Sequence, residues 1–165
     1  EEKIQKQLAS FTPLSHRLEF VGEYKHIQFY NDSLATIPQA TIHALSALGS
    51  RVATLIAGGF DRHLDYTELG SYIDAHPVAT LILFPDTGNR IWEAVSQSTR
   101  DKIRVFHVQT MEEAVSLALT HTAAKHICLL SPASASYNLF RDYADRGEQF
   151  KAWVRSLGST SSALA

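Results

Sequence analysis

Four short polar segments carry the residue types that could bind a charged ligand. They are His16 to Glu19, Tyr30 to Pro38, Gly58 to Arg62 and Leu130 to Ser136. A planar guanidinium can meet phosphate or carboxylate oxygens with two parallel hydrogen bonds. Asp and Ser side chains commonly cap helices or close turns. The segments therefore predict a site for a small anionic ligand.

Patterned runs between these segments predict the elements that position them. Residues 26–31 alternate between polar and apolar, which is typical of a strand, and fully apolar runs indicate buried strands. We expect strands over 17–24, 26–31, 51–57, 78–84, 103–107 and 126–130, and helices over 38–48, 67–75, 88–97, 110–123 and 137–156.

Buried strands that alternate with helices are typical of a parallel sheet covered on both faces. We therefore expect an α/β fold, a Rossmann-like three-layer sandwich with a mostly parallel sheet. The polar segments follow predicted strands, and ligands of open α/β sheets bind at the carboxyl ends of the strands. The expected site lies at that edge.

Length and composition indicate one domain and exclude several classes of function. The 165 residues are 45% apolar, which fits a domain over 14–155, with the tail of an upstream linker over 1–13 and a disordered tail over 156–165. The 15 basic and 17 acidic residues form no basic run, so no nucleic-acid partner is expected. No apolar run approaches the roughly 20 residues of a membrane span.

Signals for metal, thiol and phosphate chemistry are missing from the sequence. The eight histidines form no His-x-x-x-His pair, so no metal site is expected. The lone Cys128 lies in an apolar run and fits a buried position in a reducing cytoplasm. No Gly-x-x-x-x-Gly-Lys motif cradles a phosphate, so we assign no catalytic residue and expect this chain alone to be inactive towards ATP.

In this order, the four polar segments resemble the C-terminal domain of the Mur ligases, most closely the glutamate-adding members, from about Leu14 to Trp153. The resemblance implies ATP-dependent amide formation between UDP-N-acetylmuramoyl-L-alanine and D-glutamate through an acyl phosphate, in cytoplasmic peptidoglycan precursor synthesis. It also implies that ATP and Mg²⁺ are bound mainly by a central ATPase domain outside this chain.

The resemblance assigns two groups of residues. Those matched to nucleotide binding are Arg17 and Asp32, and those matched to glutamate binding are Thr36, Arg62, Ser136, Tyr137 and Tyr143. Ser136 and Tyr137 are expected at the start of the last helix, where unpaired amides and the positive helix end favour an anion.

Each assignment has a structural alternative. Arg17 could be an exposed edge-strand arginine, and Asp32 a helix cap or Asx-turn. Arg62 could pair with a neighbouring aspartate, Asp61 or Asp65, and Tyr143 could face the core.

Leu34 departs from the resemblance, because glutamate-adding members that take D-glutamate usually carry lysine there. Losing an ammonium removes a charge that could hold a phosphate or carboxylate. An L-glutamate-adding paralogue therefore stays open. So do a folylpolyglutamate-synthase-like ligase and a non-catalytic nucleotide-binding α/β module.

Overall fold

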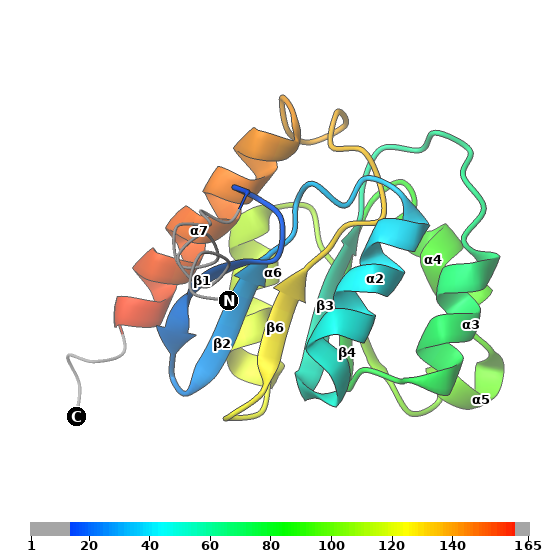
Figure 1. Ribbon diagram of the computed structural model, residues 1–165, viewed down its shortest axis with the longest axis horizontal. Coiled ribbons are helices and arrows are strands. Elements are labelled where there is room, and N and C mark those ends of the chain that lie inside the picture. Colours follow the sequence, from blue (N-terminus) through cyan, green and yellow to red (C-terminus); the bar gives the residue numbers. More distant parts are fainter. Residues whose placement is uncertain (1–13, 161–165) are drawn as a thin grey trace, which may run out of the picture.

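A six-stranded sheet forms the centre of the domain. The computed structural model describes residues 14–160, and the strand order is β1-β2-β6-β3-β4-β5 (Figure 1). The strands are β1 (Glu19–Tyr24), β2 (Ile27–Asn31), β3 (Val52–Gly58), β4 (Thr80–Phe84), β5 (Arg104–His107) and β6 (Ile127–Leu130). Only β1 runs antiparallel to its neighbour; the other pairs are parallel, which confirms the predicted sheet.

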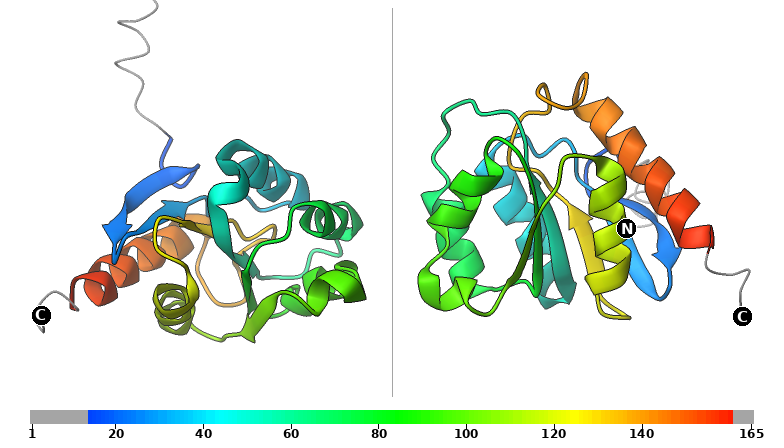
Figure 2. Two further views of the ribbon diagram at one scale, coloured as in Figure 1. Left: turned by 90° about the horizontal axis from the view of Figure 1, so that it is seen from below. Right: turned by 180° about the vertical axis from the view of Figure 1, so that it is seen from behind.

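Helices cover both faces of this sheet, as predicted. The front face in Figure 1 carries α2 (Pro38–Leu48), α3 (Thr67–Ala75) and α4 (Gly88–Ala94), with the short η1 (Gly49–Arg51) and α5 (Gln97–Arg100). The view from behind in Figure 2 shows α6 (Met111–His121) and α7 (Tyr143–Ser159) on the opposite face. Within residues 14–160, no helix is long and apolar enough to cross a membrane.

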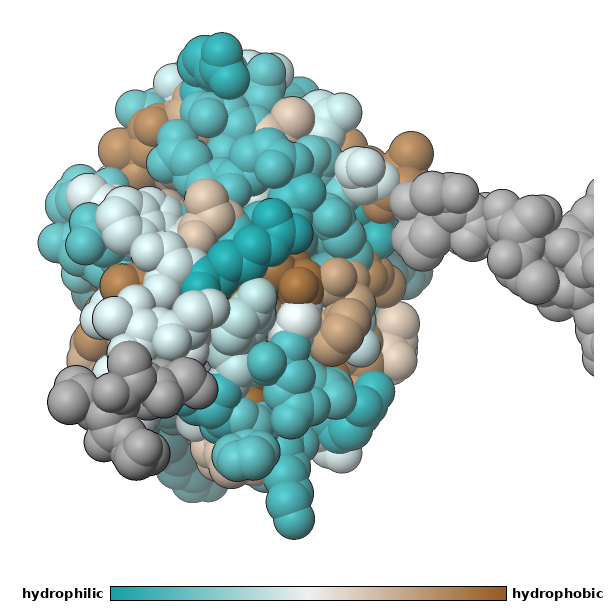
Figure 3. Space-filling model, turned by 90° about the vertical axis from the view of Figure 1, so that its left-hand side faces the viewer, coloured by the Kyte–Doolittle hydropathy of each residue, from teal (hydrophilic) through white to brown (hydrophobic). Residues whose placement is uncertain are grey.

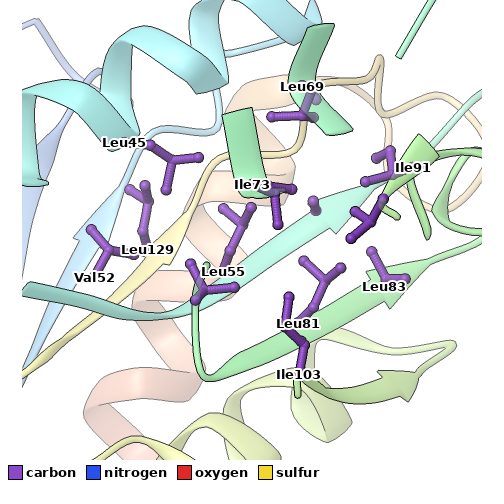
Figure 4. Close-up of a cluster of buried hydrophobic side chains, with 14 of the residues drawn as sticks. Leu45, Val52, Leu55, Leu69, Ile73, Leu81, Leu83, Ile91, Ile103 and Leu129 are labelled. Carbon is purple, nitrogen blue, oxygen red and sulfur yellow. The ribbon is translucent and has the colours of Figure 1, made fainter. Parts of the chain in front are cut away.

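Two apolar cores separate these layers. Every residue of β3 and β4 is buried, because helices cover both faces of these two strands. Figure 4 shows the front core, in which leucine and isoleucine side chains of α2, α3 and α4 meet those of the central strands. The lone Cys128 is buried in the rear core with Phe29 and Phe150, and burial raises the pKa of its thiol, as its apolar setting predicts.

The last helix differs from its prediction at both ends. It begins at Tyr143 rather than at residue 137, because the Asp142 side chain accepts a hydrogen bond from the Asp145 amide (2.8 Å) and caps the helix there. It continues to Ser159, so the expected disordered tail is wrong for 156–159. Residues 161–165 and the expected linker tail over 1–13 lie outside the described residues.

The predicted helix over 88–97 is also interrupted. It ends at Ala94, and α5 starts at Gln97. Between them, the amide and hydroxyl of Ser96 donate to the Asp74 carboxylate, 2.8–3.2 Å away, which draws the chain towards the end of α3. This tertiary contact has no local sequence signal.

Candidate functional site

The loops after β2, β3 and β6 meet at one edge of the sheet, where neighbouring strands send the chain to opposite faces; we call this edge the crevice. Strands β2 and β3 lead to α2 and α3 on one face, whereas β6 lies between them and leads to α7 on the other. Their outgoing loops rise together at the upper edge of Figure 1. Such a topological switch point is where open α/β sheets bind ligands, and three of the four polar segments lie there.

The loop after β3 reaches this crevice through two glycines. Gly58 and Gly59 have φ values of +94° and +152°, which side-chain-bearing residues rarely adopt. A β-carbon at Gly59 would also collide with the carbonyl oxygen of Ala135. The close approach lets the Phe60 amide donate to Ala135 O (2.8 Å), so the loop after β3 pairs with the loop after β6.

A chain of buried hydroxyl groups joins the loops at this edge. Ser134 Oγ lies 2.8 Å from Tyr66 Oη and 2.7 Å from Thr87 Oγ1. Thr87 Oγ1 also accepts from the Gly59 amide (3.0 Å) and lies 3.1 Å from Gly59 O. The loops after β3, β4 and β6 are thereby held against one another.

Asp32 is buried directly after β2. Its Oδ1 accepts from the Leu18 amide (3.1 Å) and its Oδ2 from Ser131 Oγ (2.8 Å). Burial raises the pKa of Asp32 above its usual value, against the effects of these hydrogen bonds and of the charge on Arg17. The carboxylate thus ties three polar segments together, a structural role that fits neither the predicted helix cap nor the Asx-turn.

A groove of about 500 Å³ opens beside Asp32, between α2 and the turn that precedes β1. Arg17 is exposed at this groove, and Leu34 lines it, with its amide donating to His16 O (3.0 Å). The remaining lining is mostly apolar: Leu18, Ala35, Ile37, Gln39, Ala40, His43, Ala44 and Ala47. The structure thus brings the two residues matched to nucleotide binding to one surface.

Arg62 is exposed in the loop after β3, and within residues 14–160 its side chain forms no ion pair. The predicted alternative, pairing with Asp61 or Asp65, is wrong. Asp61 instead binds Arg90 Nη1 (2.6 Å), and Asp65 Oδ1 accepts from the amide and hydroxyl of Thr67 (2.9 and 2.7 Å). The guanidinium of Arg62 is therefore available to a ligand.

The residues matched to the start of the last helix lie in the loop that precedes it. Ser136 is buried, whereas the Tyr137 side chain is 67% exposed and meets the Phe60 ring edge-on, with 6.2 Å between ring centroids. The prediction that Ser136 and Tyr137 stand at a helix N-terminus is therefore wrong, because Asp142 caps the helix six residues after Ser136. Their match to glutamate binding stays a prediction.

Tyr143 and Thr36 flank the crevice. Tyr143 is 41% exposed, so it does not face the core, and its backbone carbonyl oxygen accepts from Ser33 Oγ (2.7 Å). Thr36 is half-buried in the loop between β2 and α2. The structure thus places the residues matched to glutamate binding around one edge of the sheet.

No sequence signal marks Arg146, although its side chain binds two of the loops at this edge. Its side chain is 1% exposed and donates to Ser33 Oγ (2.9 Å), Ser33 O (2.9 Å) and Ser134 O (3.0 Å). Burial lowers the pKa of Arg146 to about 9, so the guanidinium is still charged at neutral pH. An arginine inside an amphipathic helix is normally expected at the surface.

Metal-ligand geometry is missing from the part of the chain that the structure describes. Between residues 14 and 160, no group of three His, Cys, Asp or Glu side chains could hold a metal ion.

Known proteins similar to the chain carry two kinds of name. The UDP-N-acetylmuramoylalanine–D-glutamate ligase of Hahella chejuensis is 39% identical over 94% of this chain and 34% of its own. The UDP-N-acetylmuramoyl-L-alanine–L-glutamate ligase of Salinispora tropica is 40% identical over 90% of this chain and 32% of its own. Relatives from several further bacteria carry the D-glutamate name. The chain spans about a third of the length of these relatives.

The fold is also found among solved structures. MurF from Acinetobacter baumannii superposes with a TM-score of 0.64 over 93% of this chain and 34% of its own, at 16% identity. The family described as Mur ligase, glutamate ligase domain, matches residues 16–134. Since that match covers more than half of the sequence, the chain belongs to this family and is a Mur ligase C-terminal domain.

Proposed function

We propose that this chain is the glutamate-binding part of a longer ATP-dependent ligase that joins glutamate to UDP-N-acetylmuramoyl-L-alanine in the cytoplasm, over a domain that extends from residue 14 through α7. The observation that carries the proposal is the pairing of Phe60 with Ala135. It joins the loop of the exposed Arg62 to the segment of Ser136 and Tyr137 at the edge of the sheet where the loop after β2 also leaves, with Asp32 in the groove that Arg17 lines.

Each matched residue has a role in this proposal. Arg62 binds a carboxylate of glutamate, for which its fork geometry is suited. Ser136, Tyr137, Tyr143 and Thr36 complete the walls around the amino acid. The exposed guanidinium of Arg17 meets phosphate oxygens, and Asp32 holds the loop that faces the nucleotide.

The residues of this chain fit only the margin of an ATP site. Arg17 offers one guanidinium to phosphate, but the sequence has no phosphate-cradling glycine loop, and residues 14–160 offer no three-residue metal cluster. We therefore assign most of the ATP and Mg²⁺ contacts to a central domain of the longer protein. That domain activates the carboxylate of the nucleotide precursor, and this chain binds and orients the attacking amine.

D-glutamate is the first candidate substrate, because relatives from several bacteria carry that name. L-glutamate is the second, and two observations favour it: Leu34 lines the groove where a lysine is usual, and the Salinispora relative is as similar as the Hahella one. Initial rates of the full-length ligase with the two enantiomers decide between them. A clear preference for L-glutamate overturns the first candidate.

Replacing Arg62 tests the carboxylate site itself. In the full-length enzyme, Arg62→Ala should raise the KM for glutamate about tenfold or more and leave the KM for ATP nearly unchanged, because a charge-assisted hydrogen bond contributes roughly 1.5–3 kcal/mol. The matched control is Arg141→Ala, which removes an arginine whose side chain is 84% exposed. An unchanged KM for glutamate in Arg62→Ala would show that Arg62 does not bind the amino acid.

A further inference from the structure

The guanidinium of Arg146 lies at the junction of the loops that surround the crevice. Within residues 14–160 it has no ion pair with a carboxylate; its partners are a hydroxyl and two carbonyl oxygens. A buried cation without an anionic partner costs free energy, since burial disfavours the charged form. The three hydrogen bonds to the loops must offset that cost, so the side chain is tied to the arrangement of these loops.

Arg146 connects the segments to which we assign substrate binding. Through Ser33 it holds the residue between Asp32 and Leu34, and through Ser134 O it holds the loop that continues to Ser136. Ser33 Oγ in turn donates to Tyr143 O (2.7 Å). One guanidinium thus joins the loops after β2 and β6 to the first turn of α7.

The loop that carries Arg62 also rests against this guanidinium. A β-carbon at Gly59 would lie 3.3 Å from Arg146 Nη1. The Gly59 backbone therefore packs closely against both Arg146 and the Ala135 carbonyl, and this packing sets the path of the chain towards Arg62. Loss of the guanidinium would let the loops after β3 and β6 shift relative to each other.

Asp32, by contrast, has anchors of its own. Its carboxylate is held by Leu18 N and Ser131 Oγ, and the Asp32 carbonyl oxygen accepts from the Ala35 amide (2.9 Å). None of these contacts involves Arg146. A change at Arg146 should therefore disturb the glutamate side of the crevice more than the nucleotide side.

We propose that Arg146 is a positioning residue for glutamate, which sets the loops of Arg62 and Ser136 at the spacing that the amino acid requires. This inference rests on the proposed function. The planar fork of arginine directs three N–H groups at fixed angles, whereas the ammonium of lysine is a compact point charge on a flexible stem. Arg146→Lys therefore keeps the charge and removes the positioning.

The test compares Arg146→Lys with Val154→Ala in the full-length enzyme. Val154 is fully buried in the rear core on the same helix, and it makes no side-chain hydrogen bond. In Arg146→Lys, the KM for glutamate should rise about ten- to a hundredfold, as displacements near 1 Å can cost that much, while the KM for ATP stays within about threefold. Val154→Ala should lower the melting temperature and leave both KM values unchanged.

Amide hydrogen exchange gives a second readout that needs no turnover. Exchange over 58–62 and 131–137 should accelerate in Arg146→Lys and not in Val154→Ala. If Arg146→Lys does not fold, Ser33→Ala removes one partner of the fork and should show the same changes at smaller amplitude.

Two outcomes overturn the inference: equal rises in both KM values, or loop exchange that matches the Val154→Ala control. A wild-type enzyme that fails to join glutamate to the nucleotide refutes the proposed function instead, and the exchange data still decide whether Arg146 positions the loops.

Discussion

Helix α7 carries two buried cations, Arg146 and Lys151, with contrasting partners. Lys151 Nζ lies 2.8 Å from Glu148 Oε1 and 3.1 Å from Glu19 Oε1, so it fastens the helix to β1. Among the residues that the structure describes, Arg146 donates hydrogen bonds only to hydroxyl and carbonyl oxygens of the crevice loops. The paired cation joins two structural elements, whereas the unpaired one organises the loops where we propose that an anionic substrate binds.

The hydrogen-bond partners of the two cations also differ in their exposure to solvent. Figure 3 shows the face that α7 and β1 present to solvent, and that face is largely hydrophilic. The Glu148 side chain is 62% exposed, so water can replace much of the hydrogen bonding that Lys151 provides to it. Water cannot replace Arg146 in the same way, because the carbonyl groups of Ser33 and Ser134 are buried. A cationic side chain therefore stabilises the local structure more at position 146 than at position 151.

The largest expected difference is in stability. Arg146→Met should lower the free energy of unfolding by about 1–3 kcal/mol, because the buried carbonyl groups of Ser33 and Ser134 lose their donor, partly offset by removal of a buried charge. Lys151→Met should cost about 1 kcal/mol or less, because its pairs are partly exposed. Urea denaturation of the two variants measures both. A larger loss in Lys151→Met would reverse the comparison.

A carboxylate lies near each cation, Glu19 at Lys151 and Asp32 next to the Ser33 that Arg146 binds, and the two should respond oppositely to pH. Burial alone would raise the pKa of Glu19, but the His16 amide, Lys151 and Asn31 together hold it below its usual value. Its stabilisation is therefore present at neutral pH and is lost as the pH falls through the folded-state pKa, below 4.5. Burial raises the pKa of Asp32 above 3.8, so the folded state binds that proton more tightly.

Two isosteric variants expose this difference. At pH 7, Glu19→Gln should be less stable than the wild type, and the gap should close as the pH falls below 4.5. The wild type should gain stability relative to Asp32→Asn as the pH falls from neutral towards 3.8. Denaturation curves between pH 7 and pH 3.5 check both slopes. Parallel slopes for the two variants would contradict the assigned environments.

The smallest effect is expected at Thr110, which is remote from both cations. Thr110 Oγ1 accepts from the Glu113 amide (3.2 Å), and Glu113 Oε2 accepts from the amides of Thr110 and Gln109 (3.1 and 2.8 Å). Thr110→Ala should cost about 1 kcal/mol by removing the cap of α6. Thr110→Ser should restore it. A changed KM for glutamate in Thr110→Ala would show that a loss of stability alone alters glutamate binding.

Local patterns in the sequence predict most of the fold. Apart from the late start of α7 and the break between α4 and α5, the strands and helices fall within a few residues of their predicted ranges, and Thr67–Ala75 and Pro38–Leu48 match at both ends. Burial on one or both faces of an element requires apolar residues at regular intervals along the chain, and this pattern is why these elements can be predicted. The polar segments likewise predict which edge of the sheet holds the crevice.

The details of that crevice depend on contacts between distant segments. Such contacts produce no repeating pattern in the sequence, so they cannot be predicted from it. The start of α7 depends on Asp142 rather than on the serine-rich loop, and Asp61 turns to Arg90 rather than to Arg62. Arg146 looks like a surface residue of a helix, and only the packing of α7 under the loops buries it. The sequence alone determines which residue types are present, but their partners depend on which loops the sheet topology brings together.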